Sequence, residues 1–251
     1  MMTELVSLIP PASLVVAAVL AVPATILGYR GSTGRSAPGV RWIKTAVTAV
    51  LFVGLVVRLV LEGAAAGGTD GWGGGRPGGY PWFPPAMAVG LALTVIADWF
   101  LAPIDNRKTF PAGLATFLLG YLVYGVAILV AVVGASGMTW PVVIGAYAFA
   151  GAVSIGQYRF LSGIPRELKA AVIAYVAVAA NLLAAAVITA ALAGPLSFRV
   201  LVPLGALSIY LSDSLIAWNL FRRPIPGYEL WIMPTYYLGQ LSIVGALLGS
   251  I

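Results

Sequence analysis

Apolar stretches of about twenty residues, separated by short polar connections, run through almost the whole chain. A helix of that length crosses the hydrocarbon core of a bilayer. Inside hydrocarbon the backbone must satisfy its own polar groups, so only helices and closed barrels cross, and barrel strands alternate apolar and polar residues. The stretches here do not alternate. The sequence therefore predicts an all-α polytopic membrane protein.

The composition excludes several classes of protein. Hydrophobic residues make up 61% of the 251 positions and charged residues only 9%, whereas about a quarter of a soluble domain is charged. Cysteine and histidine are absent, which removes thiol chemistry, imidazole bases, serine-histidine triads and the usual zinc ligands. We therefore expect no metal and no cofactor. The net charge of +6 is interpreted as contact with the lipid bilayer rather than with nucleic acid.

Hydropathy and loop signals divide the chain into eight expected transmembrane helices within a single domain, 1–251. Their predicted bounds are 6–28, 42–62, 84–102, 112–134, 140–158, 170–192, 199–220 and 230–249. The first is expected to be a retained span, because the N-terminus carries Glu4 and lacks the basic region of a secretory signal. The Gly-rich connection at about 63–82 lacks a Gly-Lys-Ser/Thr ending and is interpreted as a flexible linker.

The distribution of Lys and Arg predicts the orientation of these spans. Eleven basic residues fall in or beside connections one, three, five and seven, against three elsewhere. Because basic residues concentrate in cytoplasmic loops, both termini and the Gly-rich connection are predicted on the non-cytoplasmic side. The predicted location is a bacterial cytoplasmic (inner) membrane.

This orientation brings scattered polar residues to one depth. Asp98 and Asp213 fall in the cytoplasmic halves of the third and seventh spans, and we expect them to share a cavity open toward the cytoplasmic leaflet. The same half contains Lys44, Tyr121, Tyr124, Tyr175, Asn181, Ser212, Ser214, Asn219, Tyr236, Tyr237 and Gln240. A carboxylate at membrane depth is costly and usually has a function or a partner.

Structural explanations stand beside the functional one. Lys44 can extend to the interface, and Tyr236 and Tyr237 can belong to an aromatic belt. Asp213 can be a hydrogen-bond anchor between helices, and its two neighbouring serines can satisfy helix backbone. None of these explains why so many polar residues gather at one depth.

Two segments, 97–125 and 205–247, resemble the signature regions of the YhhN-like lysoplasmalogenase family. The more specific match comprises Ser212-Asp213-Ser214, Asn219, Phe221, Pro224, Thr235-Tyr236-Tyr237 and Gln240. Lys44 and Tyr175 match more weakly. The chain departs from the family pattern at Thr45, at Ala97 before Asp98, and at Tyr121, where the family usually has histidine.

The resemblance implies an eight-span enzyme that hydrolyses the vinyl ether bond of lysoplasmalogen to a fatty aldehyde and glycerophospho-ethanolamine or -choline. The two aspartates would be catalytic, with Asp213 as acid and Asp98 as base, or the reverse. Lys44, Arg222 and Arg223 would bind the lipid phosphate, and Tyr236, Tyr237 and Gln240 would orient water. The remaining polar residues of that half would contact the lysophospholipid. Two alternatives stay open: a lysophospholipase or other lipid ether or ester hydrolase, and a proton-coupled transporter.

Overall fold

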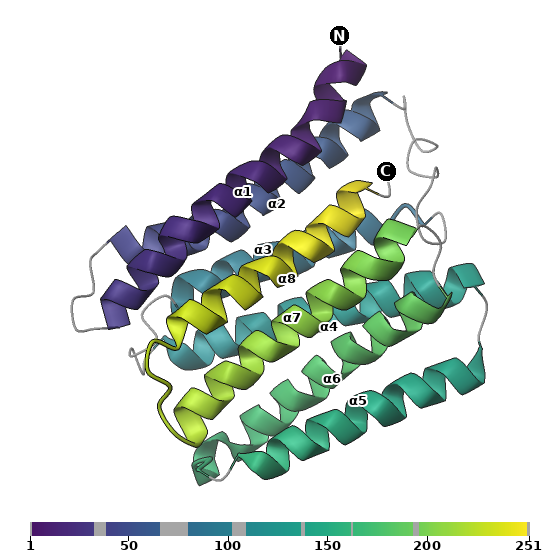
Figure 1. Ribbon diagram of the computed structural model, residues 1–251. Coiled ribbons are helices and arrows are strands. Elements are labelled where there is room, and N and C mark those ends of the chain that lie inside the picture. Colours follow the sequence, from purple (N-terminus) through teal and green to yellow (C-terminus); the bar gives the residue numbers. More distant parts are fainter. Residues whose placement is uncertain are drawn as a thin grey trace.

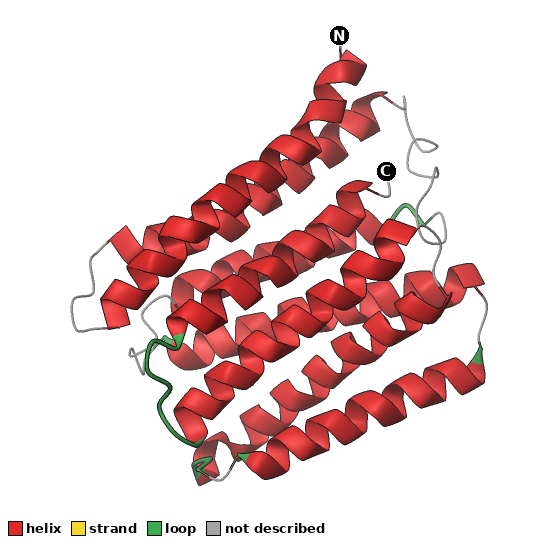
Figure 2. Ribbon diagram, viewed as in Figure 1, coloured by secondary structure: helices red, strands yellow, loops and turns green. Residues whose placement is uncertain are grey.

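The computed structural model describes residues 2–32, 39–65, 80–101, 109–136, 139–161, 163–192 and 196–249. Within these ranges all regular structure is helical (Figures 1 and 2). The α-helices are α1 (Met2–Ser32), α2 (Gly39–Ala65), α3 (Phe83–Leu101), α4 (Phe110–Ser136), α5 (Trp140–Phe160), α6 (Lys169–Leu192), α7 (Leu196–Phe221) and α8 (Glu229–Gly249). A short 3₁₀ helix, η2 (Arg166–Leu168), precedes α6. Most of the Gly-rich connection lies outside the described residues.

Each predicted span corresponds to one of these helices, so the all-α class is confirmed. Among the described residues, six helices, α2 to α7, are long and apolar enough to cross a membrane, and α1 contains a shorter apolar stretch, Ala12–Leu27. The chain is thus an integral membrane protein. The count of eight crossings and the orientation of the termini stay predictions.

Successive helices run in opposite directions, and both termini lie at the same end of the bundle (Figure 1). Six helices form a closed ring, because α2 packs on α3, α3 on α4, α4 on α6, α6 on α7, α7 on α8, and α8 on α2. Helix α1 packs outside the ring against α2 and α8, and α5 packs outside it against α6. The inside of the ring is therefore lined by helices that are distant in sequence.

Glycines allow α7 and α8 to approach closely. A Cβ on Gly205 would lie 2.9 Å from the carbonyl oxygen of Gly239, and a Cβ on Gly239 would lie 3.0 Å from that of Gly205. Small residues at helix crossings are typical of membrane bundles, where close packing rather than the hydrophobic effect drives association. This crossing fixes the relative position of α7 and α8, the two helices that contain most of the signature motif.

The outer surface suits a lipid environment. On α7, Val200, Leu204, Leu207 and Leu211 lie on one helical face and are each 40–52% exposed. Tryptophans lie near both ends of the helices, among them Trp42 and Trp99, whose rings meet edge to face at 4.6 Å, and Trp140 at the opposite end. Aromatic residues at both ends match the girdles found at membrane interfaces.

Candidate active site

A cavity of about 120 Å³ lies at the end of the bundle where α3, α5 and α7 finish and where α2, α4, α6 and α8 begin. Most of its wall is apolar. Its polar lining residues are Lys44, Asp98, Gln157, Tyr175, Tyr210, Ser212, Asp213, Tyr236 and Tyr237. Asp98 and Asp213 thus share one cavity, as the sequence predicted, although they belong to different helices and lie more than one hundred positions apart.

Asp98, near the end of α3, is held by residues from two other helices. Its Oδ2 accepts a hydrogen bond from the Tyr236 hydroxyl on α8, at 2.9 Å, and another from the Thr48 hydroxyl on α2. Lys44 on α2 lines the same cavity. Asp98 is therefore a fixed acceptor whose position depends on three helices.

Asp213, in the last half of α7, has a sparser environment. It is 9% exposed, and its Oδ2 is buried with no hydrogen-bond partner among the described residues. The Tyr175 hydroxyl on α6 is its neighbouring hydrogen-bonding group. The preceding Ser212 donates instead to the backbone carbonyl of Ile232 on α8, at 3.2 Å. Because this carboxyl oxygen has no hydrogen-bond partner among the described residues and Asp213 lines the cavity, the oxygen is available to a bound molecule or to a water.

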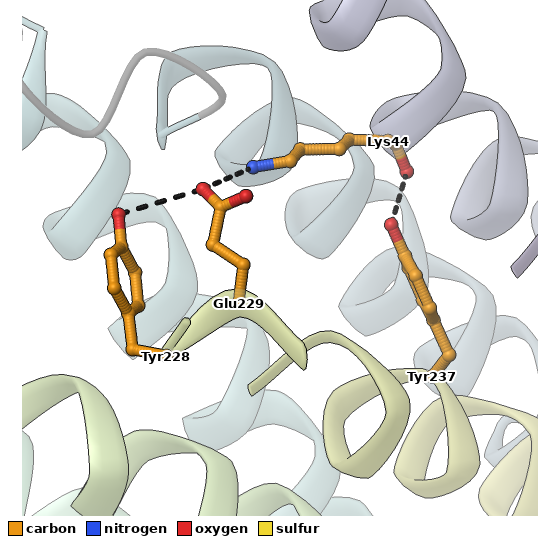
Figure 3. A network of polar contacts seen from close by, with 4 residues as sticks. All are labelled: Lys44, Tyr228, Glu229 and Tyr237. Atoms are coloured by element: carbon orange, nitrogen blue, oxygen red, sulfur yellow. Dashed lines mark hydrogen bonds and ion pairs between the residues drawn. The ribbon is translucent and has the colours of Figure 1, made fainter. Parts of the chain in front are cut away.

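Lys44 forms a buried ion pair that the sequence analysis missed. Its Nζ lies 3.1 Å from Oε1 of Glu229, and the side chains are 8% and 6% exposed (Figure 3). The Tyr228 hydroxyl donates to the same carboxylate oxygen at 3.5 Å, and the Tyr237 hydroxyl donates to the backbone carbonyl of Lys44 at 3.3 Å. Glu229 opens α8, where a negative charge is favourable. The sequence sign that could have indicated this ion pair is an acidic residue, Glu229, at the start of an apolar helix.

A second polar network joins the outer helix α5 to α7. Gln157 donates to the Ser214 hydroxyl at 2.8 Å and accepts from the Tyr210 hydroxyl at 2.6 Å. Ser214 donates in turn to the backbone carbonyl of Tyr210 at 2.6 Å. Gln157 and Tyr210 line the cavity, so this network closes its α5 side.

Four residues predicted to contact substrate do not line the cavity: Tyr121, Tyr124, Asn181 and Gln240. Tyr124 donates to Gln240 at 3.3 Å, both side chains being essentially inaccessible, and Asn181 accepts from Tyr147 at 2.7 Å. Tyr121 packs between the rings of Phe117 and Tyr175. None of the four side chains contributes to the cavity lining, and substrate contact by them stays a prediction.

Four others also lie outside the cavity lining. Asn219 accepts the backbone N–H of Ile225 at 2.8 Å and so shapes the α7–α8 connection. Arg222 donates to the backbone carbonyl of Phe160 and lies 3.9 Å above the Phe160 ring, and Arg223 faces Trp218. Ser214 belongs to the α5–α7 network. Both arginines pack against aromatic rings at the helix ends and neither lines the cavity, and phosphate binding by either one stays a prediction.

Among the described residues, no three Asp, Glu, His or Cys side chains gather closely enough to hold a metal ion. The polar side chains that line the cavity provide two carboxylates, hydroxyl groups, an amide and a lysine ammonium.

Comparison with known proteins identifies the family. A model of the YhhN family matches residues 40–247, which include every residue of the cavity lining. Lysoplasmalogenase TMEM86B of Homo sapiens is 48% identical over 46 residues, or 18% of this chain and 20% of that protein. The protein of the same name from Sus scrofa is 49% identical over 39 residues, or 16% of this chain and 17% of the relative. The matched segments thus span about a fifth of these relatives, and no solved structure matches. Because the family model extends over most of the chain, from α2 to α8, the chain belongs to the YhhN family.

Proposed function

We propose that the chain is a lysoplasmalogenase-like membrane hydrolase that cleaves the vinyl ether bond of lysoplasmalogen by aspartate acid–base catalysis. The products would be a fatty aldehyde and a glycerophospho-ethanolamine or -choline. The relatives named lysoplasmalogenase support the reaction class, although they match over short segments. The observation that carries the proposal is the presence of Asp98 and Asp213 in one otherwise largely apolar cavity.

Vinyl ether hydrolysis needs an acid and a nearby base. The acid transfers a proton to the β-carbon of the double bond, which leaves an oxocarbenium ion. Water then adds to the cationic carbon while the second carboxylate takes a proton from that water. The resulting hemiacetal breaks its bond to the glycerol oxygen, which takes a proton, and releases the aldehyde. Two carboxylates in different environments can divide these roles.

The surroundings of the aspartates suit this division. Asp98 accepts hydrogen bonds from Thr48 and Tyr236, the arrangement of a carboxylate that acts as acceptor and base. Asp213 has a buried oxygen without a partner, where a proton can face the substrate. We therefore assign Asp213 as the acid and Asp98 as the base. Tyr236 and Tyr237, which line the cavity, would orient the attacking water.

The lipid would lie with its hydrocarbon chain among the apolar lining residues and its phosphate near Lys44. This arrangement places the vinyl ether at the depth of the carboxylates. We further propose that the protein is one eight-span domain of a bacterial inner membrane, with the cavity toward the cytoplasmic leaflet. The excess of basic residues at the cavity end supports that orientation.

The proposal is tested with purified protein in detergent, offered lysoplasmalogen and, separately, lysophosphatidylcholine. Aldehyde and free fatty acid are measured as distinct products. We expect aldehyde from the vinyl ether lipid and no fatty acid from the ester. Fatty acid release with no aldehyde would replace the proposal by the lysophospholipase alternative, and absence of both products would remove the hydrolase assignment.

A further inference from the structure

We propose that Glu229 is a positioning residue, which holds the Lys44 ammonium at the cavity wall so that Lys44 can bind the phosphate of the substrate. This inference rests on the proposed function for the identity of the ligand. Glu229 itself lies outside the cavity lining, whereas Lys44 lines it, so the glutamate acts through the lysine.

The geometry gives Glu229 control over the direction of a long, flexible side chain. Lys44 arises from the first turns of α2 and Glu229 from the first turn of α8, and their contact at 3.1 Å joins these two helices (Figure 3). Tyr237 adds a second contact between the same helices at the Lys44 backbone. Both ends of the lysine are thus fixed to α8.

The attachment of Lys44 to Glu229 matters because a second carboxylate, that of Asp98, lies in the same cavity. Lys44 and Asp98 both line this cavity, so the carboxylate of Asp98 is a second anion that could attract the ammonium in this poorly solvated space. Glu229 holds the ammonium on the α8 side. The base Asp98 therefore stays available to water instead of being bound by the lysine.

The ion pair also leaves donors available to a ligand. An ammonium group carries three N–H donors. Among the described residues, Lys44 Nζ donates to Glu229 Oε1. The other N–H groups belong to a residue that lines the cavity, where a phosphate oxygen can accept them.

Direct ligand binding tests the inference without requiring turnover. The probes are a saturated alkyl ether lysophosphatidylcholine, which has no vinyl ether to hydrolyse, and the matching monoalkylglycerol, which has no phosphate. Glu229→Gln should weaken binding of the phosphate-containing probe by about 10- to 100-fold, the worth of a charged hydrogen bond. Its affinity for the monoalkylglycerol should change less than about twofold, and Glu167→Gln, at an exposed glutamate, should leave both affinities unchanged.

Two further variants separate positioning from simple stabilisation. Glu229→Asp should restore part of the phosphate preference, because it keeps the charge. Removing one partner of a buried pair destabilises, whereas replacing both by apolar residues is often neutral, so Lys44→Met/Glu229→Met should fold. That double variant should bind the phosphate probe no more weakly than Lys44→Met alone. A Glu229→Gln protein that folds and retains the phosphate preference overturns the inference, as does equal weakening of both probes.

Aldehyde release by the wild-type protein, measured beside the binding experiments, distinguishes failure of this inference from failure of the proposed function. Suppose that wild type binds the phosphate probe more tightly than Glu229→Gln, as predicted, but releases no aldehyde from lysoplasmalogen. The proposed reaction is then wrong and the positioning role of Glu229 stands. If wild type releases aldehyde while Glu229→Gln binds both probes normally, the reaction stands and the positioning role is wrong.

Discussion

The hydroxyl of Tyr236 donates a hydrogen bond of 2.9 Å to Asp98, so the last helix of the bundle supplies a partner to a carboxylate on the third. Both residues line the cavity. Tyr236 and Tyr237 of α8 are thus buried side chains of the cavity lining, which distinguishes them from an aromatic belt at the membrane interface.

Removing this hydrogen bond should impair turnover without unfolding the protein. For Tyr236→Phe we expect kcat to fall by about 10-fold, because a hydrogen bond to a charged group contributes about 1.5–3 kcal/mol at most and Thr48 still contacts Asp98. Tyr147→Phe is the matched control, since its hydroxyl bonds Asn181 away from the cavity. Aldehyde release by both variants gives the comparison, and equal rates would contradict a catalytic function of the Tyr236 contact.

The two aspartates should each be needed for chemistry. Asp213→Asn keeps the size of the side chain but loses the transferable proton, and Asp98→Asn loses the base. In each case we expect kcat to fall by about 10²–10⁴, the usual contribution of general acid–base catalysis. The measurement is aldehyde release per folded protein, with Glu167→Gln as the control. A folded Asp213→Asn protein with near wild-type turnover would leave Asp213 as a structural anchor only.

Asn219 should affect stability rather than catalysis. Its side chain accepts the backbone N–H of Ile225 in the α7–α8 connection and does not line the cavity. Asn219→Ala removes that acceptor, so we expect a lower melting temperature, corresponding to about 1–3 kcal/mol, with kcat and KM per folded protein unchanged. Thermal unfolding in detergent measures the first effect and steady-state kinetics the second. A raised KM at unchanged melting temperature would return Asn219 to the substrate site.

The glycine crossing should tolerate no side chain. A Cβ on Gly205 would lie 2.6 Å from the Ile243 side chain and 2.9 Å from the Gly239 carbonyl, so Gly205→Leu must separate α7 from α8. We expect loss of folded protein, measured by size-exclusion chromatography in detergent. Gly145→Leu is the control, because a Cβ there meets no atom within 4 Å. Equal yields of the two variants would show that the crossing is not closely packed.

The predicted orientation can be checked with reporters fused to the two ends of the chain. A periplasmic reporter should be active at both termini, and a cytoplasmic reporter should be active in the connection between α7 and α8. This follows from the basic residues at the cavity end of the bundle. Activity of a cytoplasmic reporter at the C-terminus would invert the orientation and move the cavity to the other leaflet.

Hydropathy predicted the helices well, because apolar length and loop residues are local properties. It also predicted that Asp98 and Asp213 would share a cavity, since both lie in the last part of odd-numbered helices, which finish at the same end of the bundle. It did not predict the Glu229 pair or the Gln157–Ser214 contact, which depend on which helices are neighbours. Depth alone likewise could not tell Tyr236, which lines the cavity, from Tyr124, which does not.

The ion pair of Lys44 and Glu229 joins positions 185 residues apart, and this separation bears on biogenesis. During synthesis α2 emerges long before α8, so the nascent chain must hold the charge of Lys44 without its final partner until almost the whole protein is made. Chains that stop before α8 would lack Glu229, the partner of that charge, and would leave the ring open. Insertion of α8 thus closes the ring and brings the counter-charge of Lys44 in the same step.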